Sequence, residues 1–129
     1  ELVDIHSRKI YSSEIEISAG RIAGIKALKR SNIEVQQYIL PGLIDSHIHI
    51  ESSLCTPGSF AVAAVSRGTT GVVSDPHEIA NVMGIRGIDF MLEEAEKVPL
   101  KFWFGAPSCV PATPFESAGA EIGPKEIKN

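Results

Sequence analysis

Residues 41–51, with the sequence PGLIDSHIHIE, constrain the fold of this chain more than any other stretch. On an extended strand, successive side chains point to opposite faces. One face of such a strand carries Asp45, His47, His49 and Glu51, and the other face is mostly branched aliphatic. This pattern is typical of a strand that lies between a layer of helices and a polar cavity. We therefore predict a strand with a row of metal-capable side chains on one face.

The residues after this strand predict alternating helices and strands. Thr56, Pro57 and Gly68 suit the N-cap, the first helical position and the residue just past the end of a helix. The pattern then predicts a strand, a helix, a strand and a proline-rich loop, at residues 69–74, 79–97, 100–106 and 107–114. Glu93 and Lys97 are spaced for an i,i+4 ion pair on that second helix. Alternation of this kind indicates an α/β fold with a parallel sheet.

Residues 1–40 have a different character. Their isoleucines alternate with turn-prone residues, which predicts short strands, including a hairpin that turns at Ala19 and Gly20 and a last strand at residues 35–40. We predict a small β-domain here, separate from the α/β region at residues 41–129. His6 falls in this part, and we expect it to be exposed or structural.

Polar residues follow three successive strands of the predicted sheet. The carboxyl ends of parallel strands meet at one edge, where the chemistry of such folds collects. The residues concerned are His47, His49 and Glu51 at the first strand, residues 75–78 after the second, and Ser108 and Cys109 after the third. The occurrence of polar residues at three successive strand ends is the strongest argument for a functional site that the residues alone provide.

The residue types at these strand ends suit a divalent metal ion. Two histidines at i and i+2 can place imidazole nitrogens about 2.0–2.1 Å from one ion. Imidazole with carboxylate suits a hard or borderline cation, so we add Asp75 and His77 as candidate ligands. Such an ion lowers the pKa of bound water from about 15.7 toward 7, which provides hydroxide at neutral pH. The alternative is that the histidines only form hydrogen bonds within a core.

Glu78 is the best candidate for proton transfer, because a carboxylate near a cation can act in turn as base and acid. The alternative for this stretch is helix capping by Asp75 or His77, with Glu78 favouring the positive end of the helix. Cys109 has no identifiable base near it, so we predict a buried or loop thiol rather than a nucleophile.

Composition excludes several classes of protein. A net charge of −4, from 12 basic and 16 acidic residues, argues against a nucleic-acid binder. No apolar run approaches the roughly 20 residues of a membrane helix. The two cysteines lie far apart, without a CxxC motif, which favours a reducing cytoplasm.

The motif at residues 41–49 resembles the amidohydrolase superfamily. Further stretches resemble, in the same order, the adenine deaminases of bacteria and archaea. They are IESS at residues 50–53, GTT at 68–70, DPHEIANV at 75–82 and PSCVPATPFE at 107–116. Together they cover about residues 40 to 120.

This resemblance implies a (β/α)₈ TIM barrel accompanied by a small β-sandwich-like domain, and hydrolysis of adenine to hypoxanthine and ammonia. It implies a binuclear metal centre, commonly manganese, with iron or zinc as alternatives, in a cytoplasmic homo-oligomer. His47 and His49 correspond to ligands of the first metal, and Asp75 and His77 to ligands or neighbours of a further one. Glu78 corresponds to the residue that faces the purine and moves protons, with Glu51 and Ser108 as further substrate contacts.

The family pattern also requires later metal ligands and five more barrel strands, and the sequence has no histidine after His77. We therefore expect the first three βα units of the barrel, as part of a longer protein and inactive alone. Two other interpretations stay open. One is another cyclic amidohydrolase of the dihydroorotase or hydantoinase kind, and the other is a non-catalytic chain that keeps the fold.

Overall fold

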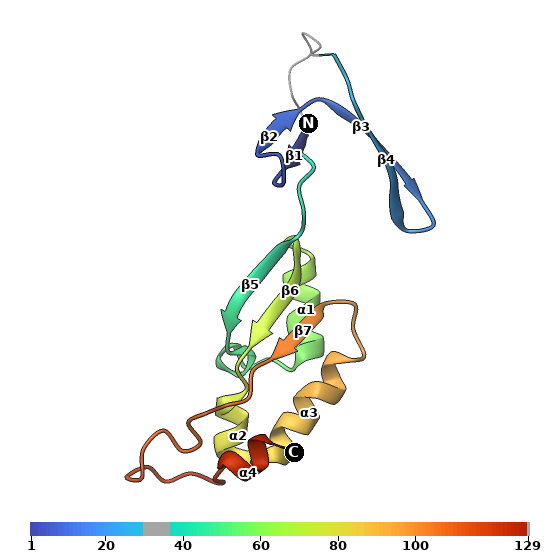
Figure 1. The fold of residues 1–129 in the computed structure, drawn as a ribbon. Helices are drawn as coiled ribbons and strands as arrows, with labels where there is room; N and C mark the ends of the chain where they lie inside the picture. Colours follow the sequence, from blue (N-terminus) through green and yellow to red (C-terminus); the bar gives the residue numbers. More distant parts are fainter. Residues whose placement is uncertain (30–36, 129) are drawn as a thin grey trace. The chain divides into compact units, whose positions relative to one another are not determined.

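The structure is a computed structural model that describes residues 1–29 and 37–128. The contacts within it divide the chain into two compact units, Glu1–Pro41 and Gly42–Asn129. Figure 1 shows the first unit built from strands and the second from strands and helices.

The first unit contains two antiparallel pairs of strands. β1 (Leu2–Asp4) pairs with β2 (Lys9–Tyr11), and β3 (Ser13–Ser18) pairs with β4 (Arg21–Ala27). Ala19 and Gly20 connect β3 to β4 with φ angles of 49° and 73°. Two successive left-handed residues match the twist of a tight hairpin, so the predicted hairpin is confirmed.

The β3–β4 hairpin carries its isoleucines in cross-strand pairs. Ile15 lies opposite Ile25, and Ile17 lies opposite Ile22. Ile17 is 72% exposed, so the described residues of this unit leave the apolar pairs largely uncovered. They form two separate two-stranded sheets rather than a sandwich. Of the strand predicted at 35–40, Ile39 forms a single parallel bridge with Leu2, and residues 35 and 36 lie outside the described part.

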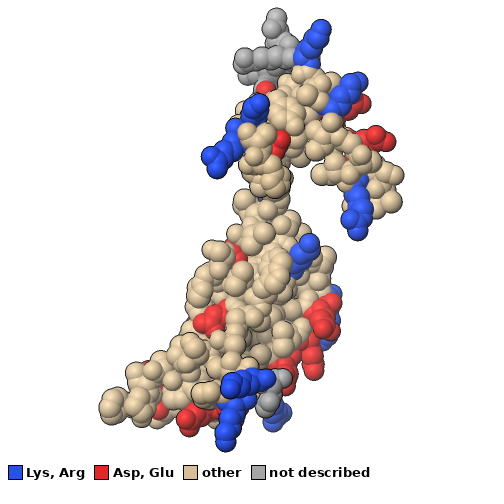
Figure 2. All heavy atoms as spheres, viewed as in Figure 1, with Lys and Arg blue, Asp and Glu red and all other residues tan. Residues whose placement is uncertain are grey.

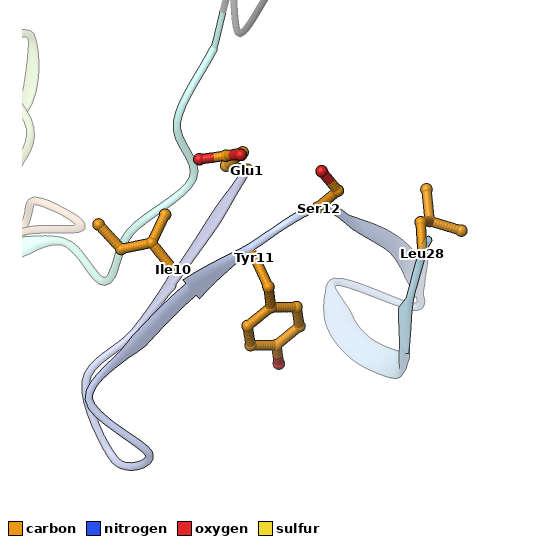
Figure 3. Close-up of a pocket in the computed structure, with 5 residues that line it drawn as sticks. All are labelled: Glu1, Ile10, Tyr11, Ser12 and Leu28. Carbon is orange, nitrogen blue, oxygen red and sulfur yellow. The ribbon is translucent and has the colours of Figure 1, made fainter. Parts of the chain in front are cut away.

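A shallow pocket in the first unit lies between the end of β2 and the residue after β4. Its lining combines a carboxylate, a phenol, a hydroxyl and two aliphatic side chains, from Glu1, Ile10, Tyr11, Ser12 and Leu28 (Figure 3). None of the residues predicted to form the site lines this pocket.

The second unit is built on a parallel three-stranded sheet in the order β5-β6-β7. The strands are β5 (Leu43–Ile48), β6 (Thr69–Ser74) and β7 (Lys101–Phe104). The helical elements are η1 (Ile50–Ser53), α1 (Pro57–Val65), α2 (His77–Met83), α3 (Ile85–Ala95) and α4 (Pro124–Ile127). The predicted α/β class and parallel sheet are confirmed, in agreement with the start of a barrel.

One face of this sheet packs against helices. Ala61 on α1, Val72 on β6 and Leu100 before β7 form a buried cluster, with Ile48 and Phe102 packed against it. In Figure 1, α1 lies behind the sheet. The next residues along the strands, Val73 and Trp103, are register partners and stay exposed. The sheet therefore has one covered face and one open, partly apolar face.

Helix α1 begins and ends where the sequence predicts. The N-cap is Thr56, whose Oγ1 accepts a hydrogen bond from the Ser59 backbone N at 3.4 Å, and Pro57 follows as the first helical residue. Gly68 adopts a positive φ just after the helix and leads directly into β6.

The single helix predicted at residues 79–97 is wrong. The chain forms two helices, α2 and α3, with Gly84 between them at φ 63° and ψ −145°. This conformation is outside the helical region and is open mainly to glycine, so the helical hydrogen bonds stop there. The predicted Glu93–Lys97 pair is also wrong, because Lys97 lies beyond the end of α3 and its Nζ pairs with Glu94 instead.

Charged side chains of both signs occur on the face drawn in Figure 2. Basic and acidic groups are present in each unit there, without a continuous basic stripe. Among the helices of the described residues, none has the length and apolar character needed to cross a lipid bilayer.

Candidate metal centre

β5 positions the first two histidines of the candidate site. His47 lies in the strand, and His49 follows it with extended backbone angles, so both rings reach the same region. The two Nε2 atoms are 3.1 Å apart, and the rings meet edge to face with centroids 4.9 Å apart. Two nitrogens that bind one ion at about 2.0–2.1 Å would themselves lie roughly 3 Å apart. The pair therefore has the separation that a shared cation requires.

The prediction that residues 41–51 form one strand is wrong at its end. The strand stops at Ile48 and the chain turns into η1, which begins at Ile50. Ile50 is completely buried, and its carbonyl accepts a 2.6 Å hydrogen bond from Ser53 Oγ. Burial of Ile50 thus accompanies a turn that moves Glu51 off the strand. Asp45 is exposed, and its Oδ1 accepts a hydrogen bond from the backbone N of His47.

β6 brings the second group of predicted ligands beside the first. Parallel pairing places Ile48 opposite Ser74, and the Asp75 backbone N donates to the Ile48 carbonyl at 3.0 Å. His77 Nδ1 then lies 3.1 Å from Asp75 Oδ2, and the rings of His77 and His49 are 4.6 Å apart at their centroids.

Two overlapping groups of metal-capable atoms result. In each group the ligand atoms lie within 4.8 Å of one another, and the members are His47, His49 and Asp75 in one and His49, His77 and Glu78 in the other. The structure thus brings together all four predicted metal ligands and Glu78. Their roles as ligands stay a prediction.

The hydrogen bond of His49 determines which of its nitrogens is free. Its Nδ1 lies 3.0 Å from the Asp75 carbonyl oxygen, which can only accept. Nδ1 must therefore carry a proton, and in the neutral ring the lone pair is on Nε2, facing His47. A backbone carbonyl that fixes the tautomer in this way is typical of metal-bound histidines.

An unpartnered oxygen at the site also suits a cation. Asp75 Oδ1 is buried and has no hydrogen-bond partner among the described residues, and Asp75 belongs to one of the two groups of metal-capable atoms. A buried carboxylate oxygen without a partner is costly, and a divalent ion would satisfy it. Imidazole nitrogens with carboxylate oxygens are a donor set for manganese, iron or zinc. The residues present therefore fit a metal centre.

Two side chains of η1 form hydrogen bonds with the first turn of α2. The N-cap of α2 is Pro76, which makes no side-chain cap. Glu51 Oε1 accepts from the Ile79 backbone N at 3.2 Å, and Ser52 Oγ donates to Glu78 Oε1 at 2.6 Å. The alternative that Asp75 or His77 caps this helix is therefore wrong. We did not predict the role of Ser52, and its signal in the sequence is its place in the IESS stretch at residues 50–53, which resembles the adenine deaminases.

The remaining candidates lie away from these contacts. Ser108 and Cys109 are exposed in the segment after β7, where Cys109 is a loop thiol as predicted, and both it and Cys55 are free. No hydrogen bond among the described residues joins Ser108 to the histidines, so its contact with substrate stays a prediction. His6 is exposed in the turn between β1 and β2, as expected.

Comparisons with known proteins agree with this geometry. Residues 38–128 match the model of the amidohydrolase family. The adenine deaminase of Methanosarcina barkeri is 56% identical over 126 residues, which are 98% of this chain and 22% of that protein. The adenine deaminase of Methanosarcina mazei is 57% identical over 94% of this chain and 21% of its own length. That of Borreliella burgdorferi is 49% identical over 97% of this chain and 23% of its own length.

The chain thus spans about a fifth of the length of these relatives. The family match covers most of the sequence and includes the histidine strand, both polar strand ends and the helices between them. This chain belongs to the amidohydrolase family.

Proposed function

We propose that this chain is the metal-binding first part of an adenine deaminase, which hydrolyses adenine to hypoxanthine and ammonia. The observation that carries the proposal is the convergence of His47, His49, Asp75, His77 and Glu78 at the carboxyl end of one parallel sheet. Relatives at 49–57% identity that are named adenine deaminases support the choice of substrate.

We propose residues 41–129 as the first three βα units of a (β/α)₈ barrel and residues 1–40 as part of a small β-domain. Successive parallel strands that neighbour one another in chain order support the barrel. Its interior would then contain the open face of the sheet, where Val73 and Trp103 are exposed.

In the proposed reaction, His47, His49, Asp75 and His77 hold one or two divalent ions. Manganese is the leading choice, with iron or zinc as alternatives. A bound ion would lower the pKa of water toward 7 and so would supply the nucleophile at neutral pH.

Glu78 performs the proton transfer in this scheme. The water oxygen forms a bond to C6 of the purine, and the bond from C6 to the exocyclic nitrogen breaks. Glu78 accepts a proton from the water and delivers it to the leaving nitrogen, so that ammonia departs. Glu51 and Ser108 are proposed to contact the purine, and we further propose a cytoplasmic homo-oligomer in purine metabolism.

The test uses the complete polypeptide encoded by the gene, purified with manganese. We expect hypoxanthine and ammonia from adenine, with stoichiometric metal. Turnover of dihydroorotate or a hydantoin without turnover of adenine would favour another cyclic amidohydrolase. A folded protein with neither metal nor turnover would favour the non-catalytic interpretation.

A further inference from the structure

Two neighbouring side chains of η1 make hydrogen bonds with two neighbouring residues of α2. Glu51 Oε1 accepts from the backbone N of Ile79, and Ser52 Oγ donates to Glu78 Oε1. The partners are separated by 28 and 26 residues along the chain. The short 3₁₀ turn after the first histidine pair is therefore linked to the helix that carries Glu78.

α2 depends on this link because it lacks a cap of its own. The first N–H groups of a helix have no partner within the helix, and a polar side chain at the N-cap normally accepts from one of them. Pro76 occupies that position and has no polar side chain. Glu51 supplies the missing acceptor, which fixes the first turn of α2 against η1.

The contact from Ser52 acts on the side chain of Glu78 itself. Its length of 2.6 Å is typical of a hydroxyl that donates to an ionised carboxylate. Glu78 also lies with His49 and His77 in one group of atoms within 4.8 Å. A glutamate has several rotamers, and the Ser52 bond selects one that lies beside the histidines.

We infer that Ser52 is a positioning residue, whose hydroxyl holds the carboxylate of Glu78 beside the His49–His77 pair. The inference rests on the proposed function, in which Glu78 transfers protons during adenine hydrolysis. Proton transfer requires the carboxylate within hydrogen-bond reach of the reacting atoms, so loss of its orientation slows the chemical step. We expect the chemical step to depend on this bond more than substrate affinity does, because proton transfer is the role proposed for Glu78.

The test compares Ser52→Ala, Ser52→Thr and Ser53→Ala in the complete polypeptide encoded by the gene. Ser52→Thr keeps the hydroxyl. Ser53→Ala is a matched control, because Ser53 Oγ donates to the Ile50 carbonyl within η1 rather than to α2. The measurements are kcat and KM for adenine, and the position of the Glu78 carboxylate in crystals of each variant.

We expect Ser52→Ala to lower kcat by about 10- to 100-fold while KM changes by less than about threefold. Ser52→Thr should recover kcat to within about threefold of wild type, and Ser53→Ala should stay within about twofold. Of the three crystal structures, only that of Ser52→Ala should show the Glu78 carboxylate displaced from its wild-type position.

Two results would overturn the inference. One is a kcat for Ser52→Ala equal to that of Ser53→Ala, and the other is a Glu78 carboxylate that keeps its place without the Ser52 hydroxyl. Failure of the proposed function would look different, since the wild-type protein itself would then not hydrolyse adenine. The position of Glu78 in the crystals would still decide the role of Ser52 in that case.

Discussion

The two units of this chain differ in how far their apolar side chains are buried. The buried apolar residues of the described part all belong to the second unit, whereas Ile17 and Ile22 of the first are 72% and 63% exposed. A two-stranded sheet has no second layer to cover it and is marginally stable alone. The parallel sheet of the second unit is covered on one face by α1, and a buried apolar cluster forms there.

The same contrast holds for the histidines. His6 lies exposed in a turn of the first unit, where its backbone N donates to Asp4 Oδ1 in the same turn. In the second unit, strand pairing places Asp75 beside Ile48 and so brings His49 and His77 together. The packed sheet of the second unit thus supplies its histidines with the neighbouring side chains that a metal site requires. The predictions below test this comparison, from the largest expected effect to the smallest.

Removing a histidine of the second unit should have the largest effect. His49 belongs to both groups of metal-capable atoms, so His49→Ala should lower the metal content and reduce adenine turnover by at least about 100-fold. Metal analysis and an assay for hypoxanthine measure both effects. The matched control is His6→Ala, which should change neither. Equal losses in the two variants would break the comparison.

Truncation of a leucine should cost much stability in the second unit and little in the first. Leu100 is 3% exposed, and Leu100→Ala should lower the free energy of unfolding by about 2–5 kcal/mol. Leu28 is 46% exposed, and Leu28→Ala should cost no more than about 0.5 kcal/mol. Urea unfolding is followed by the fluorescence of the single tryptophan, Trp103, which lies in the second unit, and by far-ultraviolet circular dichroism, which also reports the strands of the first unit. A similar cost for both variants would contradict a core confined to that unit.

A smaller effect is expected at the cap of α1. Thr56→Ala removes the acceptor for the Ser59 backbone N and should lower stability by about 1 kcal/mol. Thr56→Ser keeps the acceptor and is the control. The same fluorescence measurement applies, and an unchanged midpoint in Thr56→Ala would show that this cap contributes nothing to the second unit.

The smallest effect on stability is expected in the turn between β1 and β2 of the first unit. The Ser7 hydroxyl, with the Ser7 and His6 backbone N–H groups, donates to Asp4 and holds the pKa of that carboxyl below its ordinary value. A lowered pKa means that the turn gains stability above the ordinary pKa of an aspartate and loses it as the pH falls through the lowered pKa. NMR titration should show the Asp4 pKa rising in Ser7→Ala. An unchanged pKa would contradict the role of the hydroxyl.

The sequence pattern predicted the helices and strands whose ends are marked by the residues at those ends. The β-branched run at 69–74 coincides with β6, and Thr56 and Pro57 begin α1. The break at Gly84 was missed, because the apolar spacing continues across this residue although its positive φ interrupts the helical backbone. The turn after His49 was missed for another reason, since it accompanies burial of Ile50, which depends on the folded structure.

In the candidate site, too, some features could be predicted from the sequence pattern and others depend on the folded structure. Placing polar residues at strand ends was enough to predict that His47, His49, Asp75 and His77 lie together. The contact of Ser52 with Glu78 joins segments 26 residues apart, so no local pattern indicates it. The assignment of ligand and substrate roles also stays a prediction, because it concerns atoms outside the chain.

Anomalous diffraction tests the central claim most directly, with crystals of the complete polypeptide grown in manganese and data collected on both sides of the manganese edge. We predict a strong anomalous peak between the Nε2 atoms of His47 and His49, about 2.0–2.2 Å from each. A map without a peak there, in which the two nitrogens remain bonded to each other at 3.1 Å, would contradict a shared metal ion.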